Sequence, residues 1–194
     1  MQNNYALQTE QARILFSRQD PDAVAHRHNL RTDSSGLWLE FCGKTYQLRR
    51  KDAQVLRSDG TPAGFEETLS IYDLLNHTQS APLAGEWCSV YALPHTLRSG
   101  SGIGPAAGTG ETGVSAAQFL AACQSVGTAL PSKADFSFQI PVFGKLSVLL
   151  QYWQADDEFP AKLQCLWDKN AREFVLFETM FYIMGHLYRQ LGFE

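Results

Sequence analysis

Hydrophobic positions near the start of the chain recur at helical spacing. Along residues 5–16 the apolar side chains fall loosely on one face of a helix. Asp20 and Pro21 follow, and an aspartate cap before a first-turn proline favours the start of a short second helix. We therefore expect a helical N-terminal segment over residues 1–30, packed on the rest of the fold.

The pattern then changes to that of strands. Residues 37–41 and 45–48 are rich in aromatic and other strand-favouring side chains and flank Gly43, which predicts an antiparallel hairpin. Over residues 66–77 the apolar positions return to near-helical spacing and predict a third helix. Residues 86–93 have the composition of a short strand.

A glycine-rich stretch and a capping pair mark the middle of the chain. Residues 98–113 are dense in glycine and predict a loop. Ser115 and Gln118 fit a capping box, in which each side chain satisfies a backbone N–H group, and they predict a helix over residues 116–126. Gly127 stands where a glycine commonly ends a helix.

The last third of the chain alternates again before it ends in a helix. Residues 136–140, 145–153 and 161–167 predict three strands, with a hairpin loop at 155–160. The run Asn170-Ala-Arg-Glu173 resembles a capping box and predicts the start of a long amphipathic helix. The apolar stripe of that helix consists of Phe174, Phe177, Phe181, Met184, Tyr188 and Leu191, with Leu176, Met180, Ile183 and Leu187 beside it.

Together these elements predict an α+β fold, with antiparallel sheet elements packed against several helices. The 194 residues suit a single domain spanning residues 1–194, and a composition of 44% hydrophobic and 19% charged residues excludes a disordered chain. A net charge of −4 supplies no positive field for nucleic acid. We expect no membrane association, because no apolar run approaches the length of a bilayer span. Four scattered cysteines and the absence of a signal-peptide pattern favour a cytoplasmic location.

One glycine motif invites a nucleotide-binding interpretation that its surroundings disfavour. Residues 108–113 match G-x-G-x-x-G and precede a helix, but no hydrophobic strand leads into the first glycine. Backbone amides here, with Arg98 nearby, can receive an anionic group, although a surface loop is the commoner interpretation. His26 and His28 have no third ligand at a suitable spacing, and we predict no metal site.

Acidic and aromatic side chains coincide in the predicted hairpin loop. Asp156, Asp157 and Glu158 are adjacent, Trp153 precedes them and Phe159 follows. Such carboxylates can bind a hard cation or act as acid and base. Aromatic side chains beside acids also form recognition surfaces. Solvated loop charges and core aromatics are the plainer alternatives.

Several sequence runs resemble a known family. They are Tyr72-Asp-Leu-Leu75, Pro82-Leu-Ala-Gly-Glu-Trp87, Leu93-Pro94, Ile140-Pro-Val142, Tyr152-Trp-Gln-Ala-Asp-Asp-Glu-Phe-Pro160 and Leu166-Trp-Asp168. From about Gly36 onward the chain resembles a prokaryotic family catalogued as domain of unknown function 3786. The string W-x-x-D-[DE]-E-F-P is the most specific part of the likeness. Two features depart from the family pattern, namely Trp167 in place of a phenylalanine and a longer glycine-rich stretch.

The resemblance implies a single α+β domain of a bacterial or archaeal intracellular family and brings no established activity. Some relatives appear joined to a cysteine-rich iron–sulfur segment, which the printed sequence does not contain, so no cluster is carried over. The cofactor therefore stays unknown.

Our leading hypothesis is a non-catalytic accessory domain that binds a small molecule or a protein partner. Its candidate ligand-binding residues are Glu86, Trp87, Arg98, Trp153, Asp156, Asp157, Glu158 and Phe159. The alternative is an enzyme that uses the carboxylates of residues 156–158 as acid and base, with or without a divalent cation, and it predicts a desolvated carboxylate in a cleft. A third hypothesis is a structural subunit that associates through an exposed apolar patch.

Overall fold

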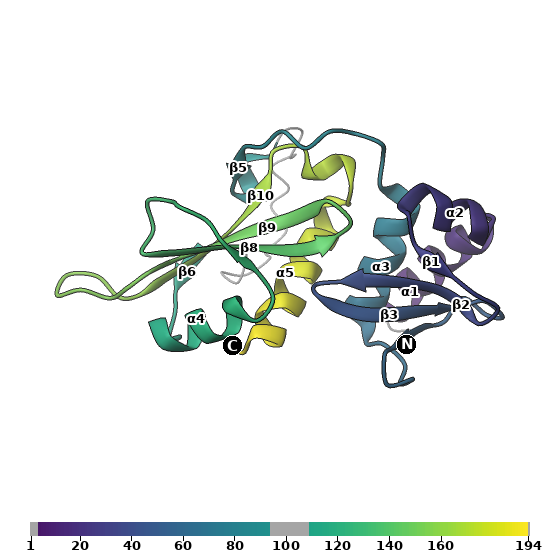
Figure 1. Cartoon of the computed structure of the whole chain (residues 1–194), viewed down its shortest axis with the longest axis horizontal. Coiled ribbons are helices and arrows are strands. Elements are labelled where there is room, and N and C mark those ends of the chain that lie inside the picture. Colours follow the sequence, from purple (N-terminus) through teal and green to yellow (C-terminus); the bar gives the residue numbers. More distant parts are fainter. Residues whose placement is uncertain (1–3, 94–108, 194) are drawn as a thin grey trace.

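The computed structural model describes residues 4–93 and 109–193, and within them two antiparallel sheets share the molecule with five α-helices. The first sheet has the strand order β1-β2-β3-β4 and the second the order β5-β10-β9-β8-β7, with β6 also paired to β10 (Figure 1). The predicted α+β class is confirmed. Among the described helices, none combines the length and apolarity needed to cross a bilayer.

The N-terminal part contains three helices around the first sheet. Its elements are α1 (Asn4–Ser17), α2 (Pro21–His28), β1 (Arg31–Thr32), β2 (Gly36–Phe41), β3 (Lys44–Arg49), β4 (Val55–Arg57) and α3 (Phe65–His77). The Asp20 side chain caps α2 by accepting a hydrogen bond from the Asp22 N–H, as predicted. The β2–β3 hairpin turns at Cys42 and Gly43, which both have positive φ, the backbone geometry that suits a tight hairpin.

The C-terminal part contains the second sheet and two helices. Its elements are β5 (Trp87–Cys88), a 3₁₀ turn (Val90–Ala92), β6 (Thr109–Glu111), α4 (Ala116–Gln124), β7 (Thr128–Ala129), β8 (Phe136–Phe143), β9 (Leu146–Trp153), β10 (Lys162–Asp168), a second 3₁₀ turn (Ala171–Glu173) and α5 (Phe177–Leu191). Ser115 and Gln118 form the predicted capping box of α4.

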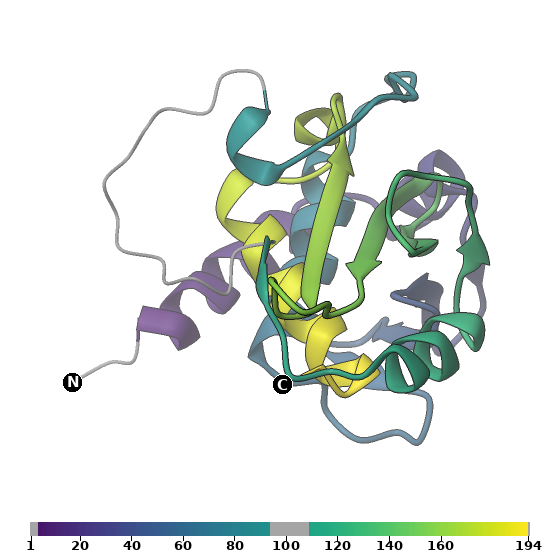
Figure 2. The same ribbon diagram turned by 90° about the vertical axis from the view of Figure 1, so that its left-hand side faces the viewer.

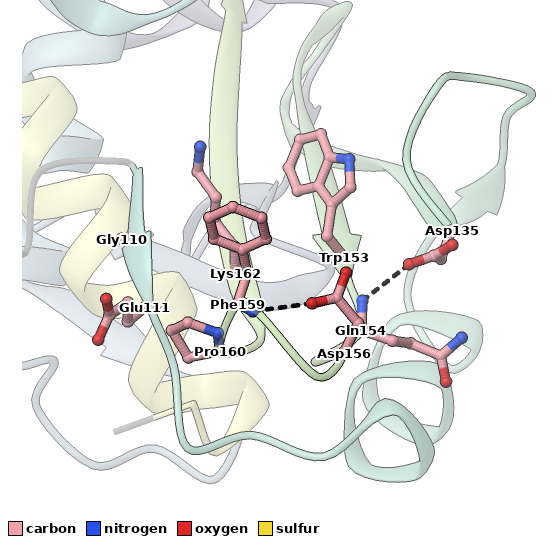
Figure 3. A pocket seen from close by; sticks show the side chains of 9 residues that line it. All are labelled: Gly110, Glu111, Asp135, Trp153, Gln154, Asp156, Phe159, Pro160 and Lys162. Carbon is pink, nitrogen blue, oxygen red and sulfur yellow. Dashed lines mark hydrogen bonds between the residues drawn. The ribbon is translucent and has the colours of Figure 1, made fainter.

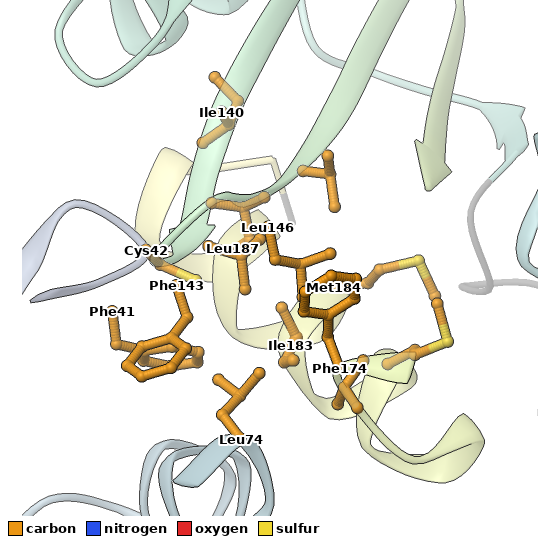
Figure 4. Packing of buried hydrophobic residues seen from close by; sticks show 14 of the residues in the cluster. Phe41, Cys42, Leu74, Ile140, Phe143, Leu146, Phe174, Ile183, Met184 and Leu187 are labelled. Atoms are coloured by element: carbon orange, nitrogen blue, oxygen red, sulfur yellow. The ribbon is translucent and has the colours of Figure 1, made fainter. Parts of the chain in front are cut away.

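The second sheet and α3 both pack against α5, which lies between them (Figures 1 and 2). One cluster of buried side chains runs through both parts of the chain. In it, Phe41 and Leu74 from the N-terminal part meet Leu146 and Leu187 from the C-terminal part (Figure 4). Two hydrogen bonds cross the same junction, since the Cys42 N–H donates to the Val142 carbonyl and the Cys42 carbonyl accepts from the Gln190 amide.

The structure corrects the expected strand at residues 86–93, the expected start of the final helix and the expected role of Gly127. It also places the short strand β6 within the predicted loop over residues 98–113. The strand expected over residues 86–93 is limited to Trp87–Cys88, and a 3₁₀ turn follows it. The final helix begins at Phe177, not at the capping-box-like run 170–173, which forms a separate 3₁₀ turn without a side-chain cap. The N–H of Leu176, just before α5, instead donates to the buried Asp73 carboxylate of α3 at 2.9 Å.

The third correction concerns Gly127. The α4 helix ends at Gln124, and Gly127 is not in the left-handed region that a helix-ending glycine adopts. A Cβ at this position would lie 2.4 Å from Cδ1 of Ile140 on β8. Gly127 is therefore required for the close approach of the α4–β7 connection to the sheet.

Candidate functional site

The loop that joins β9 to β10 has an ordered turn at its tip. The Asp156 carboxylate accepts hydrogen bonds from the N–H groups of Glu158 and Phe159 at 2.9 and 2.8 Å. The N–H of Asp156 donates to the carbonyl of Phe159 at 3.0 Å. These bonds close the turn, which is an aspartate-based loop of the kind that side chains of Asp and Asn stabilise. Asp156 thereby fixes the backbone that carries the Phe159 ring.

This loop forms one wall of a cavity of about 810 Å³, which we call the Trp–Phe pocket (Figure 3). Its lining residues are Gly110, Glu111, Asp135, Trp153, Gln154, Asp156, Phe159, Pro160 and Lys162. Phe159 is 66% exposed, although phenylalanine is usually buried. Trp153 is half-buried, so it offers part of its indole to the pocket.

Strand register explains how four of these side chains meet. Lys162 of β10 stands opposite Glu111 of β6 on one side and opposite Trp153 of β9 on the other. Phe136 of β8 pairs with Tyr152, and extending that register by one residue places Asp135 beside Trp153. Directly opposed residues of antiparallel strands project from the same face. The result is a cross-strand row in the order Glu111, Lys162, Trp153 and Asp135.

The charges of the pocket are predominantly negative. Among the described lining residues, three carboxylates, those of Glu111, Asp135 and Asp156, face one ammonium group, that of Lys162. The Lys162 ammonium lies 5.6 Å from the centre of the Trp153 ring, within the range of a cation–π interaction. Asp135 also accepts a hydrogen bond from the Gln154 N–H at 2.7 Å, which ties the start of the loop to β8.

The structure brings together only part of the set of residues predicted from the sequence. Trp153, Asp156 and Phe159 line the Trp–Phe pocket. Asp157 and Glu158 lie on the same loop, are exposed and do not line it.

Glu86 and Trp87 belong to a different region. Trp87 pairs with Asp168 at the opposite end of β10 from Lys162, about 20 Å away at ~3.3 Å per residue. Glu86 forms an exposed ion pair with Lys169 at 3.0 Å. Arg98 lies outside the described residues, as do the glycines between residues 100 and 108.

The loop carboxylates lack the burial that the enzyme hypothesis requires. Asp156, Asp157 and Glu158 are all exposed, whereas the enzyme hypothesis predicts a carboxylate that is desolvated in a cleft. A buried carboxyl with a raised pKa does occur at Asp73, where burial outweighs the hydrogen bonds it accepts. It lies on α3, outside the Trp–Phe pocket, and it accepts the N–H of Leu176.

Metal and thiol chemistry find little support in the described part of the chain. No group of three or more histidine, cysteine or acidic side chains is arranged there to hold a metal ion. Cys42, Cys123 and Cys165 are buried, and burial raises the pKa of each thiol, that of Cys123 to about 12. Cys88 is partly buried and its pKa is also raised, first by burial and then by the charge of Asp168. These thiols are protonated near neutral pH and are poor nucleophiles.

Sequence reasoning missed Glu111, Asp135 and Lys162 as members of the pocket. Lys162 and Asp135 could have been predicted, because a correct register for the three strands places both beside Trp153. Glu111 could not have been predicted, because β6 is a three-residue strand inside a segment whose glycines predict a loop. Its strand pairing depends on β10, more than forty residues later in the chain.

Comparison with known families adds one finding. Residues 111–190 match the model of a family described as Domain of unknown function (DUF3786). This segment belongs to that family. The DUF3786 segment includes α4, β7 to β10 and α5, together with every residue of the Trp–Phe pocket except Gly110. The upstream part of the resemblance, from about Gly36, lies before the matched residues. No curated protein and no solved structure matches the chain.

The family-like runs outside the pocket have structural roles. Asp168 is buried and accepts hydrogen bonds from the N–H groups of Ala84, Gly85 and Asn170 at 2.8 to 2.9 Å. It thus joins the run 82–87 to the run 166–168. Asp73 of the run 72–75 holds the N–H before α5. These two carboxylates hold backbone in place, and neither lines the Trp–Phe pocket.

Proposed function

We propose that the chain is a non-catalytic binding module that takes a ligand group into the Trp–Phe pocket. The observation that carries this proposal is the pair of rings, Trp153 and Phe159, held at an open cavity of about 810 Å³ by a hydrogen-bonded turn. Ligand sites combine exposed aromatic surface with a few polar groups in a concave setting. Because the turn is already ordered, binding costs little conformational entropy.

The sequence string most specific to the family resemblance supports the same location. Within Trp153–Pro160, the tryptophan, the first aspartate, the phenylalanine and the proline all line the pocket. The other two acids, Asp157 and Glu158, are exposed on the turn and give no indication of a second binding site. The string therefore has a physical interpretation as the wall of one binding site.

The exposure and the hydrogen bonds of the pocket acids support a non-catalytic role. Asp135 and Asp156 each accept backbone hydrogen bonds that fix the loop. Both side chains are exposed, whereas catalytic acids and bases are commonly held in a desolvated cleft. The rings and the carboxylates suit recognition better than proton transfer.

The experiment is an NMR titration of the four tryptophan indole N–H signals. Choline, benzoate and glucose serve as cationic, anionic and neutral probes at millimolar concentrations, and Trp153→Phe assigns the Trp153 signal. We expect at least one probe to shift the Trp153 signal while the Trp87 signal stays in place. Trp87 is a suitable internal control because it is also half-buried and lies beside β10, at the far end.

Two results would contradict the proposal. One is an unchanged Trp153 signal with all three probes. The other is a set of shifts that persists in Phe159→Ala, because loss of the exposed ring removes one wall of the pocket without opening the core. Circular dichroism of Phe159→Ala, which we expect to match that of the parent protein, verifies that the variant is folded.

A further inference from the structure

The Trp–Phe pocket combines aromatic faces with an excess of negative charge. We infer that its ligand carries a weakly hydrated organic cation, a guanidinium or N-alkylated ammonium group. This inference rests on the proposed function and adds the chemical class of the ligand. The face of an aromatic ring is negative and attracts a cation, while the surrounding carboxylates raise the local concentration of positive ions.

Lys162 already shows what the Trp153 ring attracts. Its ammonium lies 5.6 Å from the ring centre and forms no ion pair within the described part of the chain, although Glu111 is its cross-strand neighbour. The ammonium therefore holds the place of a ligand cation over the indole (Figure 3). Because Lys162 is exposed, its side chain can swing into solvent when a ligand enters.

Hydration decides which cation wins this position. A primary ammonium such as that of Lys162 is compact and strongly hydrated, so contact with a ring costs it much of its water shell. A guanidinium or quaternary ammonium is more weakly hydrated, and it loses less on contact with the two rings. The ligand cation is thus expected to displace Lys162 from the ring face.

The carboxylates are placed around the rings on three sides. Glu111 comes from β6, Asp135 from the start of β8 and Asp156 from the turn (Figure 3). The backbone bonds accepted by Asp135 and Asp156 hold both carboxylates in position, and neither forms an ion pair with a cation among residues 4–93 and 109–193. All three are exposed, so their attraction is screened and the affinity should weaken with added salt.

The first test compares choline with 3,3-dimethylbutan-1-ol, which has the same shape without the charge. Binding is followed at the assigned Trp153 indole signal. We expect choline to bind on the order of tenfold more tightly than the alcohol. The gain comes from the cation–π contact and from the nearby carboxylates. Equal affinity for the two probes would overturn the inference and leave the proposed function standing. The absence of binding by choline, the alcohol, benzoate and glucose alike would instead overturn the proposed function.

The second test measures whether each of two charge variants raises or lowers the affinity for choline. Glu111→Gln removes an attractive charge and should weaken choline binding several-fold, whereas Lys162→Met removes the internal competitor and should strengthen it. Glu173→Gln and Lys51→Met change exposed charges elsewhere and serve as matched controls that leave the affinity unchanged. Unchanged choline binding in Glu111→Gln, or weaker choline binding in Lys162→Met, would contradict the inference.

A third arm distinguishes a free ligand from a peptide-borne one. The tripeptide Gly-Arg-Gly presents a guanidinium on a chain, and its affinity is compared with that of choline in the same titration. Tighter binding of the peptide supports a protein partner with an arginine side chain, and tighter binding of choline supports a small quaternary amine. The two ligands should also compete for one site. If adding the peptide did not displace choline at Trp153, a single cation site would be contradicted.

Discussion

At the scale of the residue, Asp168 shows how a buried acid can organise backbone. Its carboxylate accepts three N–H groups, from Ala84, Gly85 and Asn170, and no lysine or arginine is paired with it in the described structure. Charge-assisted hydrogen bonds of this kind are stronger than neutral ones, and removal of the acceptor leaves several donors unsatisfied. Asp168 therefore fixes the loop before β5 to the end of β10.

We predict that Asp168→Ala destabilises the fold by about 2 to 4 kcal/mol, because several backbone N–H groups near the core lose their acceptor. Urea denaturation followed by circular dichroism measures the change. The matched control is Glu86→Ala, which removes an exposed ion pair nearby and should leave the midpoint almost unchanged. Equal midpoints for Asp168→Ala and the parent protein would rule out this role.

A second residue-scale prediction concerns pH and Glu67. Burial disfavours its charge, but hydrogen bonds from Arg57, Tyr46 and the Gly64 N–H outweigh burial and lower the pKa of Glu67 from 4.5 to about 2. A carboxyl with a depressed pKa stabilises the fold fully above its unfolded pKa and loses that contribution as the pH falls towards its folded pKa. The relevant window is thus pH 4.5 down to 2.

Glu67→Gln should lower the free energy of unfolding at neutral pH, on the order of 2 kcal/mol, and flatten its decline over that acidic window. Urea titrations at a series of pH values measure both effects. Glu173→Gln, at an exposed position, provides the comparison. If the slope of stability against pH in Glu67→Gln equalled that of the parent protein, the depressed pKa would be wrong.

At the scale of the element, helix ends and close approaches were the hardest features to infer. The capping box of α4 was predictable because Ser115 and Gln118 are local partners. The start of α5 was not predictable, because the N–H of Leu176, just before the helix, donates to Asp73, about a hundred residues earlier in the chain. The role of Gly127 was equally hidden, since the side chain that excludes a Cβ belongs to Ile140 on another element.

Gly127→Ala provides the element-scale prediction. Its Cβ would also lie 2.9 Å from the Gln139 carbonyl oxygen, so either α4 or β8 must shift, and we expect a loss of about 1 to 3 kcal/mol. Thermal or urea denaturation measures the loss. Gly113→Ala is the matched control, because nothing lies within 4 Å of its Cβ position and its φ is not in the left-handed region. Equal stability of the two variants would contradict the proposed close approach.

At the scale of the whole molecule, the two sheets share one core. Phe41 of the first sheet is fully buried and stacks on His186 of α5 with ring centres 5.3 Å apart. Cys42 bonds to both Val142 and Gln190 across the junction. These contacts favour the expectation that residues 1–194 fold as a single domain, with no stable half.

We predict one cooperative unfolding transition. During urea denaturation the indole signals of Trp38 in the first sheet and Trp167 in the second should share a midpoint. Phe41→Ala should lower both midpoints together, by about 3 kcal/mol of stability, because it opens a cavity in the shared core. Two separated transitions, or a shift confined to Trp38, would show that the sheets form independent units.

The sequence alone was informative where interactions are local and weak where they are long-range. The strand positions from residue 136 onward and the presence of a final amphipathic helix followed from periodicity. The coincidence of Trp153, Asp156 and Phe159 was visible in one short loop. Grouping Glu86 and Trp87 with them relied on composition, and strand pairing places both at the far end of β10. The cross-strand row of Glu111, Lys162, Trp153 and Asp135 depends on the register of four strands.

An organic cation bound in the Trp–Phe pocket would contact both Trp153 and Phe159. The most direct measurement is the set of intermolecular nuclear Overhauser effects between the N-methyl protons of choline and the ring protons of the protein. We predict cross-peaks to the indole protons of Trp153 and to the ring protons of Phe159, and their loss in Trp153→Ala. Cross-peaks confined to Trp38 or Trp87, or an absence of cross-peaks at saturating choline, would show that the Trp–Phe pocket does not bind the cation.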